Sequence, residues 1–143
     1  MEQTVRNLFE RYERFFAKGL IDQVDADELT SLYTPEFIAA SPEGVTTGKL
    51  DETLIRSMSA GYERYRAIGT KQMRVHSLRI SPIDEHHAVA HVGWTATYIR
   101  DDLPETTIDF TVHYLMQVRG DEAKVFGWIT GDEDAALKEH GII

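Results

Sequence analysis

The chain of 143 residues contains no cysteine, which excludes disulfides, thiolate nucleophiles and cysteine-bound zinc or iron–sulfur clusters. Basic residues are also scarce: 15 lysines and arginines stand against 24 aspartates and glutamates, and the net charge is -9. Nucleic acids and anionic membranes are bound by surfaces rich in lysine and arginine. We therefore expect neither nucleic acid nor a membrane among the partners of this protein.

Long apolar runs are absent as well. No segment approaches the length of a membrane span, and the first residues, Met1 to Arg6, are polar rather than the apolar core of a signal peptide. A cytoplasmic location is the expectation that follows. Hydrophobic residues make up 42% of the chain and charged residues 27%, which is typical of a folded globular protein. At this length we expect residues 1–143 to form one domain.

The first half of the chain has the apolar spacing of helices. Apolar residues recur at steps of three and four in the N-terminal stretch, and Gly19 is the expected end of this helix. A short helix is expected near Asp25 to Tyr33, and another runs from an N-cap at Asp51 to Gly69. Between these two helices, residues 37–39 predict a short strand, followed by turn residues.

After Lys71 the apolar period changes to two, which is typical of strands. The turns between the expected strands are short, so consecutive strands should pair antiparallel. Helices followed by a meander of strands predict an α+β fold rather than an alternating α/β fold. The expected strands are Met73–Ile80, His87–Ile99, Thr107–Val118 and Lys124–Thr130, and the expected final helix is Asp132–Glu139.

Alternate residues of a strand face opposite sides of a sheet. In the third expected strand one phase is apolar, whereas the other contains Asp109 and His113. If the hairpin before this strand is centred on Asp102, His91 lies opposite His113 and Thr95 lies opposite Asp109. The apolar phase should lie beneath the helices. Its aromatic members, together with those expected on the helices, are Trp94, Tyr98, Phe110, Tyr114, Phe126, Trp128, Tyr12, Phe16 and Tyr62.

Three stretches of the chain carry a family resemblance. They are Tyr33–Ile38 followed by Gly44 and Gly48, Asp109–Leu115 running into Arg119–Asp121, and Lys124–Ile129 running into Asp132–Leu137. Together they resemble the nuclear-transport-factor-2-like superfamily, in particular its polyketide-cyclase-like (SnoaL-like) and steroid-isomerase-like branches. The likeness covers nearly the whole chain, and its motifs are signatures of a fold rather than of a reaction.

That resemblance implies a cone-shaped domain: a curved antiparallel sheet, three N-terminal helices packed on its concave face, and a short C-terminal helix. It also implies a hydrophobic pocket between helices and sheet, and a homodimer formed through the open sheet face. Members of the superfamily include isomerases, dehydratases, cyclases and hydrolases. The isomerase-like members use acidic residues inside the cone, whereas Asp109 of this chain falls in the phase opposite to the aromatic lining.

Aromatic residues expected to face the helices are the candidate ligand-binding residues. Their hydroxyl and indole groups can hold a substrate oxygen, and the alternative is that they only pack the core. These candidates are Trp94, Tyr98, Phe110, Tyr114, Trp128 and Tyr62.

His113 and Asp109 are the candidate catalytic residues, because a nearby carboxylate can fix the tautomer of a histidine that acts as a general base. The alternative places them, with His91, in water or at a dimer interface. The segment Asp84–His87 has metal-binding residue types, but adjacent histidines at a tight turn point apart and no third ligand is spaced to meet them. We expect a solvated turn there, and we expect no metal or other cofactor.

The sequence leaves two functions open. The first hypothesis is a small-molecule-binding domain with an aromatic-lined pocket, extending to cofactor-free acid/base chemistry of the isomerase, cyclase or dehydratase type on an apolar carbonyl or hydroxyl compound. The second is a non-catalytic dimeric binding or association module whose pocket is filled by side chains. A cavity of about 300 Å³ or more favours the first hypothesis. Metal-assisted hydrolysis is a third and disfavoured hypothesis.

Overall fold

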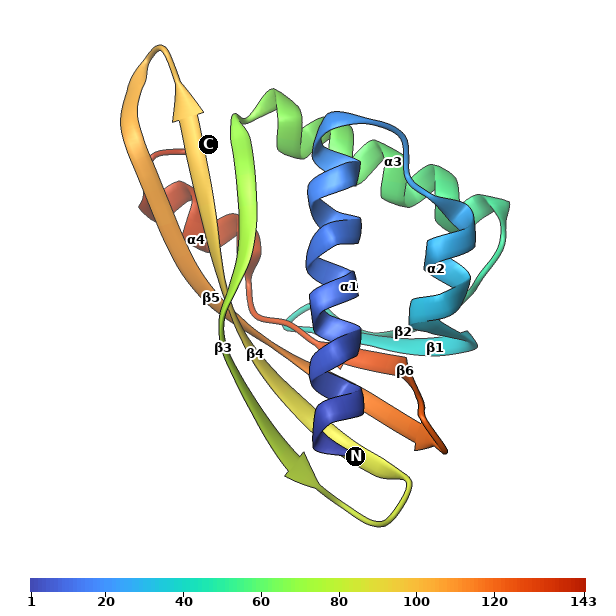
Figure 1. The fold of residues 1–143 in the computed structure, drawn as a ribbon. Helices are drawn as coiled ribbons and strands as arrows, with labels where there is room; N and C mark the ends of the chain where they lie inside the picture. Colours follow the sequence, from blue (N-terminus) through green and yellow to red (C-terminus); the bar gives the residue numbers. More distant parts are fainter.

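The computed structural model describes residues 1–143 and confirms the predicted α+β fold, with four helices and six strands (Figure 1). In chain order the elements are α1 (Glu2–Ile21), α2 (Ala26–Leu32), β1 (Tyr33–Ser41), β2 (Gly44–Lys49), α3 (Glu52–Ala67), β3 (Thr70–Pro82), β4 (His87–Arg100), β5 (Leu103–Arg119), β6 (Glu122–Ile129) and α4 (Glu133–Glu139). None of the four helices is long and apolar enough to cross a membrane.

Three of the helices begin at an aspartate whose side chain accepts backbone hydrogen bonds. At the start of α3, Asp51 Oδ1 accepts from the amide nitrogen of Leu54 at 2.9 Å, which confirms the predicted N-cap. Asp25 and Asp132 cap α2 and α4 in the same way. The cap at Asp132 places the next residue, Glu133, in the first turn of α4, where it becomes part of the site described below.

The first helix continues past Gly19, its predicted end, as far as Ile21. A Cβ atom at Gly19 would lie only 2.9 Å from ring atoms of Tyr62 in α3. Gly19 therefore does not end α1. It allows α1 and α3 to approach each other closely, because glycine has no side chain to collide with the tyrosine ring.

The six strands form one sheet in the order β2-β1-β6-β5-β4-β3. The segment from β3 to β6 is the predicted antiparallel meander. The predicted register of its central hairpin is confirmed, since His91 lies opposite His113 and Thr95 lies opposite Asp109. This register fixes which side chains of β4 and β5 face the helices.

Two features of the sheet differ from the expectation. A strand, β2, occupies a segment between the predicted turn residues and α3 for which the sequence predicted no strand, and β1 is longer than the predicted residues 37–39 and pairs parallel with β6. β2 is an edge strand with nearly all residues exposed, so it has no alternating apolar pattern to recognise. The parallel pairing joins two segments far apart in the chain, which a local pattern does not encode.

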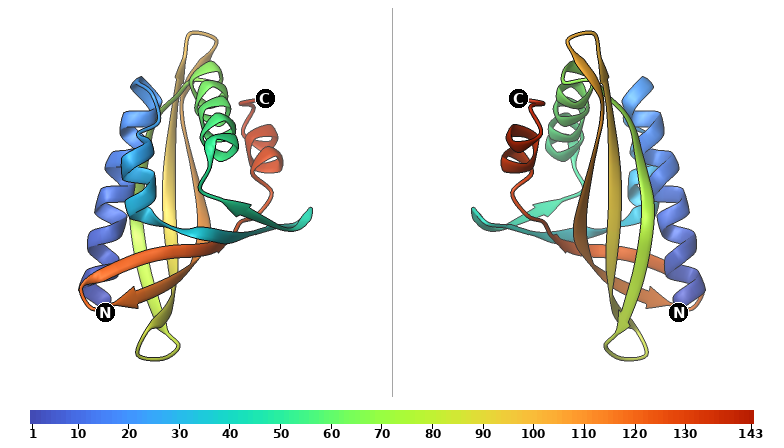
Figure 2. Two further views of the ribbon diagram at one scale, coloured as in Figure 1. Left: turned by 90° about the vertical axis from the view of Figure 1, so that its right-hand side faces the viewer. Right: turned by 90° about the vertical axis from the view of Figure 1, so that its left-hand side faces the viewer.

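The sheet is strongly bent. The long strands β3, β4 and β5 run together, and β6, β1 and β2 cross them at a steep angle (Figure 2). The helices lie on the concave side, with α1 along the long strands and α3 and α4 near each other at one end (Figures 1 and 2). This arrangement is the cone-shaped architecture expected from the family resemblance.

The core lies between α1 and the long strands, where Phe9 and Trp94 are at most 2% exposed. The prediction that Phe126 lies beneath the helices is wrong. The pairing of β5 with β6 shifts register between residues 115 and 116, and Val125 rather than Phe126 is fully buried. Phe126 instead contacts the ring of His87 at a centroid distance of 6.1 Å. One extra residue at a β-bulge reverses the facing of the residues on one side of it, which explains the error.

Candidate functional site

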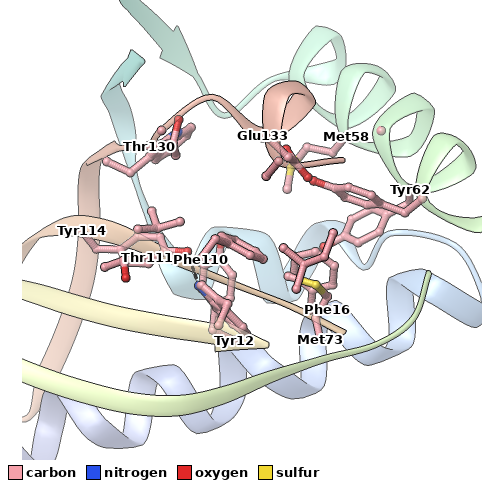
Figure 3. Close-up of a pocket in the computed structure, with 18 of the residues that line it drawn as sticks. Tyr12, Phe16, Met58, Tyr62, Met73, Phe110, Thr111, Tyr114, Thr130 and Glu133 are labelled. Atoms are coloured by element: carbon pink, nitrogen blue, oxygen red, sulfur yellow. Dashed lines mark hydrogen bonds between the residues drawn. The ribbon is translucent and has the colours of Figure 1, made fainter. Parts of the chain in front are cut away.

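A cavity of about 430 Å³ lies between the bent sheet and helices α1, α3 and α4 (Figure 3). Of the 24 residues that line it, 18 are hydrophobic. Its volume falls in the range of about 300 to 1,000 Å³ that is usual for small-molecule pockets. The structure brings together in this lining all six candidate ligand-binding residues, Trp94, Tyr98, Phe110, Tyr114, Trp128 and Tyr62.

Three buried tyrosines of this lining bring their hydroxyl groups together. The hydroxyls of Tyr12 and Tyr33 hydrogen-bond to each other, and the hydroxyl of Tyr114 lies close enough to affect the pKa of Tyr12. The indole Nε1 of Trp94 donates a hydrogen bond of 3.1 Å to the hydroxyl oxygen of Tyr114. We call Tyr12, Tyr33 and Tyr114 the tyrosine cluster. Its members come from α1, β1 and β5, so only the folded chain assembles it.

The tyrosine cluster has a hydrogen-bond donor to spare. Burial raises the pKa of all three hydroxyls, so each keeps its proton. No hydrogen bond joins Tyr33 to Tyr114, so the three hydroxyls form at most two bonds with one another, and at least one of their three protons has no acceptor in the cluster. A ligand oxygen in the cavity can accept it.

A carboxylate lies across the cavity from the tyrosine cluster. Glu133 of α4 lies beside Met58 and Tyr62 of α3 (Figure 3). The residue stands at the rim and is exposed to solvent, but protein atoms surround its carboxyl group, and this burial raises the pKa of Glu133. A hydrogen bond with Tyr65 and the charge of Arg64 lower that pKa in part. Glu133 thus holds a carboxyl group between water and an aromatic cavity.

The lining carries negative charge and no positive charge. No lysine, arginine or histidine contributes to it, and its acidic members are Asp132 and Glu133. Asp132 is engaged as the cap of α4, where its Oδ1 accepts from the amide nitrogen of Ala135 at 2.9 Å. Burial raises the pKa of Tyr98 to about 12, and the charge of Glu133 adds to this rise. Glu133 is therefore the carboxylate available to a ligand.

The candidate catalytic residues His113 and Asp109 lie on the outer face of the sheet and line no part of the cavity. Each interacts with β4 rather than with the other. The Nδ1 atoms of His91 and His113 are 2.7 Å apart, and Thr95 Oγ1 donates to Asp109 Oδ1 at 2.7 Å. Burial, with the charges of Arg79 and His113, lowers the pKa of His91. A catalytic role for His113 and Asp109 stays a prediction and would require a substrate on this outer face.

The turn between β3 and β4 holds a compact set of polar contacts. Asp84 Oδ1 accepts from the amide nitrogen of His86 at 2.8 Å and lies 2.8 Å from Nδ1 of His87. The side chains of Asp84 and His87 are both partly exposed to solvent. Nowhere in the structure do three or more histidine, aspartate or glutamate side chains converge as metal ligands do.

Two residues of the site, Glu133 and Tyr65, are not singled out by sequence patterns. An acidic residue after Asp132 reads as the favourable first turn of a helix, because it complements the helix dipole. Tyr65 reads as one more member of an apolar stripe. Their contact depends on α3 and α4 lying together, where Arg64 Nη2 is 2.9 Å from Asp134 Oδ1.

Solved structures with a similar fold differ strongly from this chain in sequence. An NTF2-like protein of unknown function from Shewanella oneidensis MR-1 is 14% identical, with a TM-score of 0.67 over 92% of this chain and 98% of that chain. An NTF2-like protein with a cystatin-like fold from Novosphingobium aromaticivorans is 13% identical, with a TM-score of 0.68 over 99% and 88%. A putative calcium/calmodulin dependent protein kinase II association domain from Xanthomonas campestris is 13% identical, with a TM-score of 0.59 over 89% and 84%.

At these identities the similarity shows the fold alone. No curated protein matches the sequence. The polyketide-cyclase-like and steroid-isomerase-like branches stay predictions, because the structural neighbours do not separate them. Residues 2–133 match the family model described as NTF2-like protein (DUF6841), and the chain therefore belongs to this NTF2-like family.

Proposed function

We propose that this protein binds one apolar small molecule in the cavity, with a carbonyl or hydroxyl oxygen of the ligand at the tyrosine cluster. The observation that carries the proposal is an aromatic cavity of about 430 Å³ that contains a hydroxyl proton with no acceptor in the cluster. Burial of apolar surface favours binding of the ligand body. The hydrogen bond to the cluster then selects its orientation, since a ligand without the oxygen leaves the donor unsatisfied.

A matched pair of probes tests this proposal. 2-Decalone and 2-methylenedecalin share one apolar body and differ in carrying C=O or C=CH₂. The chain has 2 tryptophans, Trp94 and Trp128, and both line the cavity, so a change in intrinsic fluorescence reports its occupancy. We expect both probes to bind, the ketone about threefold to tenfold more tightly.

Single hydroxyl deletions locate the oxygen within the cavity. Tyr33→Phe should reduce the preference for the ketone, because it removes one of the hydroxyls that can offer the spare proton and leaves that proton at a different place in the cluster. Tyr65→Phe, on the side of Glu133, is the matched control and should keep the preference. If neither probe binds to the wild-type protein, the proposed function is wrong.

Glu133 makes acid/base chemistry on the same ligand a second candidate function. A carboxylate whose pKa is raised is better matched to proton transfer near neutral pH. In such a step the ligand carbonyl is conjugated with a C=C bond. Glu133 takes a proton from the γ carbon beyond that bond, and the C–H electron pair moves through the C=C bond into a dienolate whose oxygen accepts a bond from the tyrosine cluster. Glu133 then returns the proton to the α or γ carbon. Uptake of deuterium from D₂O at the γ carbon of 1(9)-octal-2-one, followed by NMR, should be faster with wild type than with Glu133→Gln.

The outer face of the sheet supports a separate proposal, a homodimer. Ile38 and Ile129 are 41% and 47% exposed there, and Ile129 lies opposite His113. Exposed large apolar residues beside a half-buried polar network are compatible with a surface that a second copy covers. The structural similarity to a putative association domain from Xanthomonas campestris favours the same role. An association module needs only this face, whereas the open cavity on the other side favours ligand binding.

A further inference from the structure

We infer that the ligand of the cavity carries a positively charged nitrogen at the end that meets Glu133. This inference rests on the proposed function, because it specifies the class of molecule that the same cavity accepts. That class is an apolar amine with a carbonyl or hydroxyl oxygen at its other end. The charge of the lining, the aromatic rings near Glu133 and the positions of the two polar ends support it.

The charge of the lining excludes an anionic ligand. A carboxylate or phosphate entering the cavity would lose its water and meet no lysine, arginine or histidine. Instead it would meet Asp132 and Glu133. Burying a charge without an opposite charge is costly, and placing it near like charges adds to the cost. A cationic group meets the opposite situation at the same place.

Glu133 lacks a cation of its own. The nearest guanidinium, that of Arg64, is engaged by Asp134 at 2.9 Å and does not line the cavity. Tyr65 and the more distant charge of Arg64 offset the burial of the Glu133 carboxyl only in part. An ammonium group on the ligand would supply the missing opposite charge at the rim.

Aromatic rings near Glu133 complete a site for a cation. Tyr62 lies beside Glu133 (Figure 3), and the ring of Tyr65 is 6.0 Å from that of Tyr62 at an interplanar angle of 69°. Ring faces attract a cation placed within about 6 Å of the ring centre. A carboxylate together with these two rings favours an ammonium over a neutral hydroxyl.

The two polar ends of the cavity determine how such a ligand lies. Tyr12 and Tyr114 are on one side of the cavity and Glu133 is on the other (Figure 3). A ligand with its oxygen at the tyrosine cluster therefore directs its far end toward Glu133. An ammonium paired with Glu133 also occupies the carboxylate that proton transfer would need, so a ligand of this class is bound rather than isomerised.

Three probes that share one decalone body test the inference: 6-aminomethyl-2-decalone, 6-hydroxymethyl-2-decalone and 6-oxodecalin-2-carboxylate. They carry a cation, a neutral group and an anion at the far end at about pH 7.5. We expect dissociation constants from tryptophan fluorescence to rank amine, alcohol, acid, with the amine about tenfold tighter than the alcohol. Glu133→Gln should abolish the advantage of the amine over the alcohol. Glu139→Gln, which removes a charge from the far end of α4 outside the cavity, should leave the ranking intact.

The outcomes separate this inference from the proposed function. Binding of the alcohol, with the amine no tighter, overturns the inference and leaves the proposed function standing. An advantage of the amine that survives Glu133→Gln also overturns the inference, because the charge then acts elsewhere. If none of the three probes binds, both the proposed function and the inference are wrong.

Discussion

The indole Nε1 of Trp94 donates a hydrogen bond of 3.1 Å to the hydroxyl of Tyr114, and both side chains line the cavity. The two residues come from neighbouring strands, where Tyr114 lies opposite Ala90. This contact links the packing of the core to the polar end of the site.

Tyr114→Phe removes the acceptor of that bond while keeping the aromatic ring. The Trp94 side chain is 1% exposed, so its N–H cannot turn to water. We expect the free energy of unfolding, measured by urea denaturation, to fall by about 1–3 kcal/mol. Tyr62→Phe is the matched control, because no protein group hydrogen-bonds to its hydroxyl, and it should cost less. Equal losses in the two variants would contradict the assigned bond.

The two tryptophans should differ in their contribution to stability. Trp94 is 1% exposed and contacts Tyr12 and Phe16 at centroid distances of 5.8 and 5.9 Å. Trp94→Ala should lower the free energy of unfolding by about 3–5 kcal/mol. Trp128 is only half-buried and stacks on Phe37 at 5.1 Å, so Trp128→Ala should cost less. A smaller loss for Trp94 than for Trp128 would mean that β4 turns its other face to the helices.

The sequence predicts the fold where one face of an element is buried and the alternation is regular. β4 and β5 meet this condition, and their register follows from the Asp102 turn. Prediction fails at Phe126, because a bulge reverses the alternation, and at β2, because an exposed edge strand has no alternation. It also fails at Gly19, where a glycine used for helix packing resembles a helix end.

Two helical glycines predict opposite responses to alanine. A Cβ atom at Gly61 of α3 would meet no heavy atom within 4 Å, so Gly61→Ala should stabilise the protein by about 0.5–1 kcal/mol through helix propensity. Gly19→Ala should destabilise it, because the new Cβ would lie 2.9 Å from the Tyr62 ring. Thermal unfolding of both variants checks the signs. Since Gly61 lines the cavity, Gly61→Leu should also fill it and weaken binding of 2-decalone.

The outer face of the sheet predicts how self-association responds to charge. If two copies meet there, His113→Glu places a carboxylate in the interface and breaks the contact with His91, so the dimer dissociation constant should rise at least about tenfold. Sedimentation equilibrium measures it, and His140→Glu at the end of α4 is the control. A dimer that resists His113→Glu contradicts the proposed interface. Loss of 2-decalone binding in the same variant would move His113 to the ligand site.

The site itself is only partly encoded in local patterns. The six aromatic candidates were accessible to prediction because each sits at an inward position of a strand or on an apolar helix stripe. The tyrosine cluster and the pairing of Glu133 with Tyr65 arise from contacts between elements that lie far apart in the chain. Such contacts depend on the bend of the sheet and on the docking of α4, and neither leaves a periodic signal.

Glu133 predicts an unusual dependence of stability on pH. Burial raises its pKa in the folded protein above the ordinary value of 4.5, so the folded state binds a proton more tightly than the unfolded chain does. Below pH 4.5 the group is neutral in both states, and stability is then lost as the pH rises through the folded pKa. The side chain in Glu133→Gln stays neutral throughout. Between pH 4 and pH 7 the free energy of unfolding of this variant, measured by urea denaturation, should therefore rise relative to that of wild type. The change seen in Glu139→Gln over the same pH range is subtracted as the control. A relative fall in the free energy of unfolding would mean that Tyr65 and Arg64 lower the pKa of Glu133 more than burial raises it. The carboxylate at the rim would then already be satisfied by the protein.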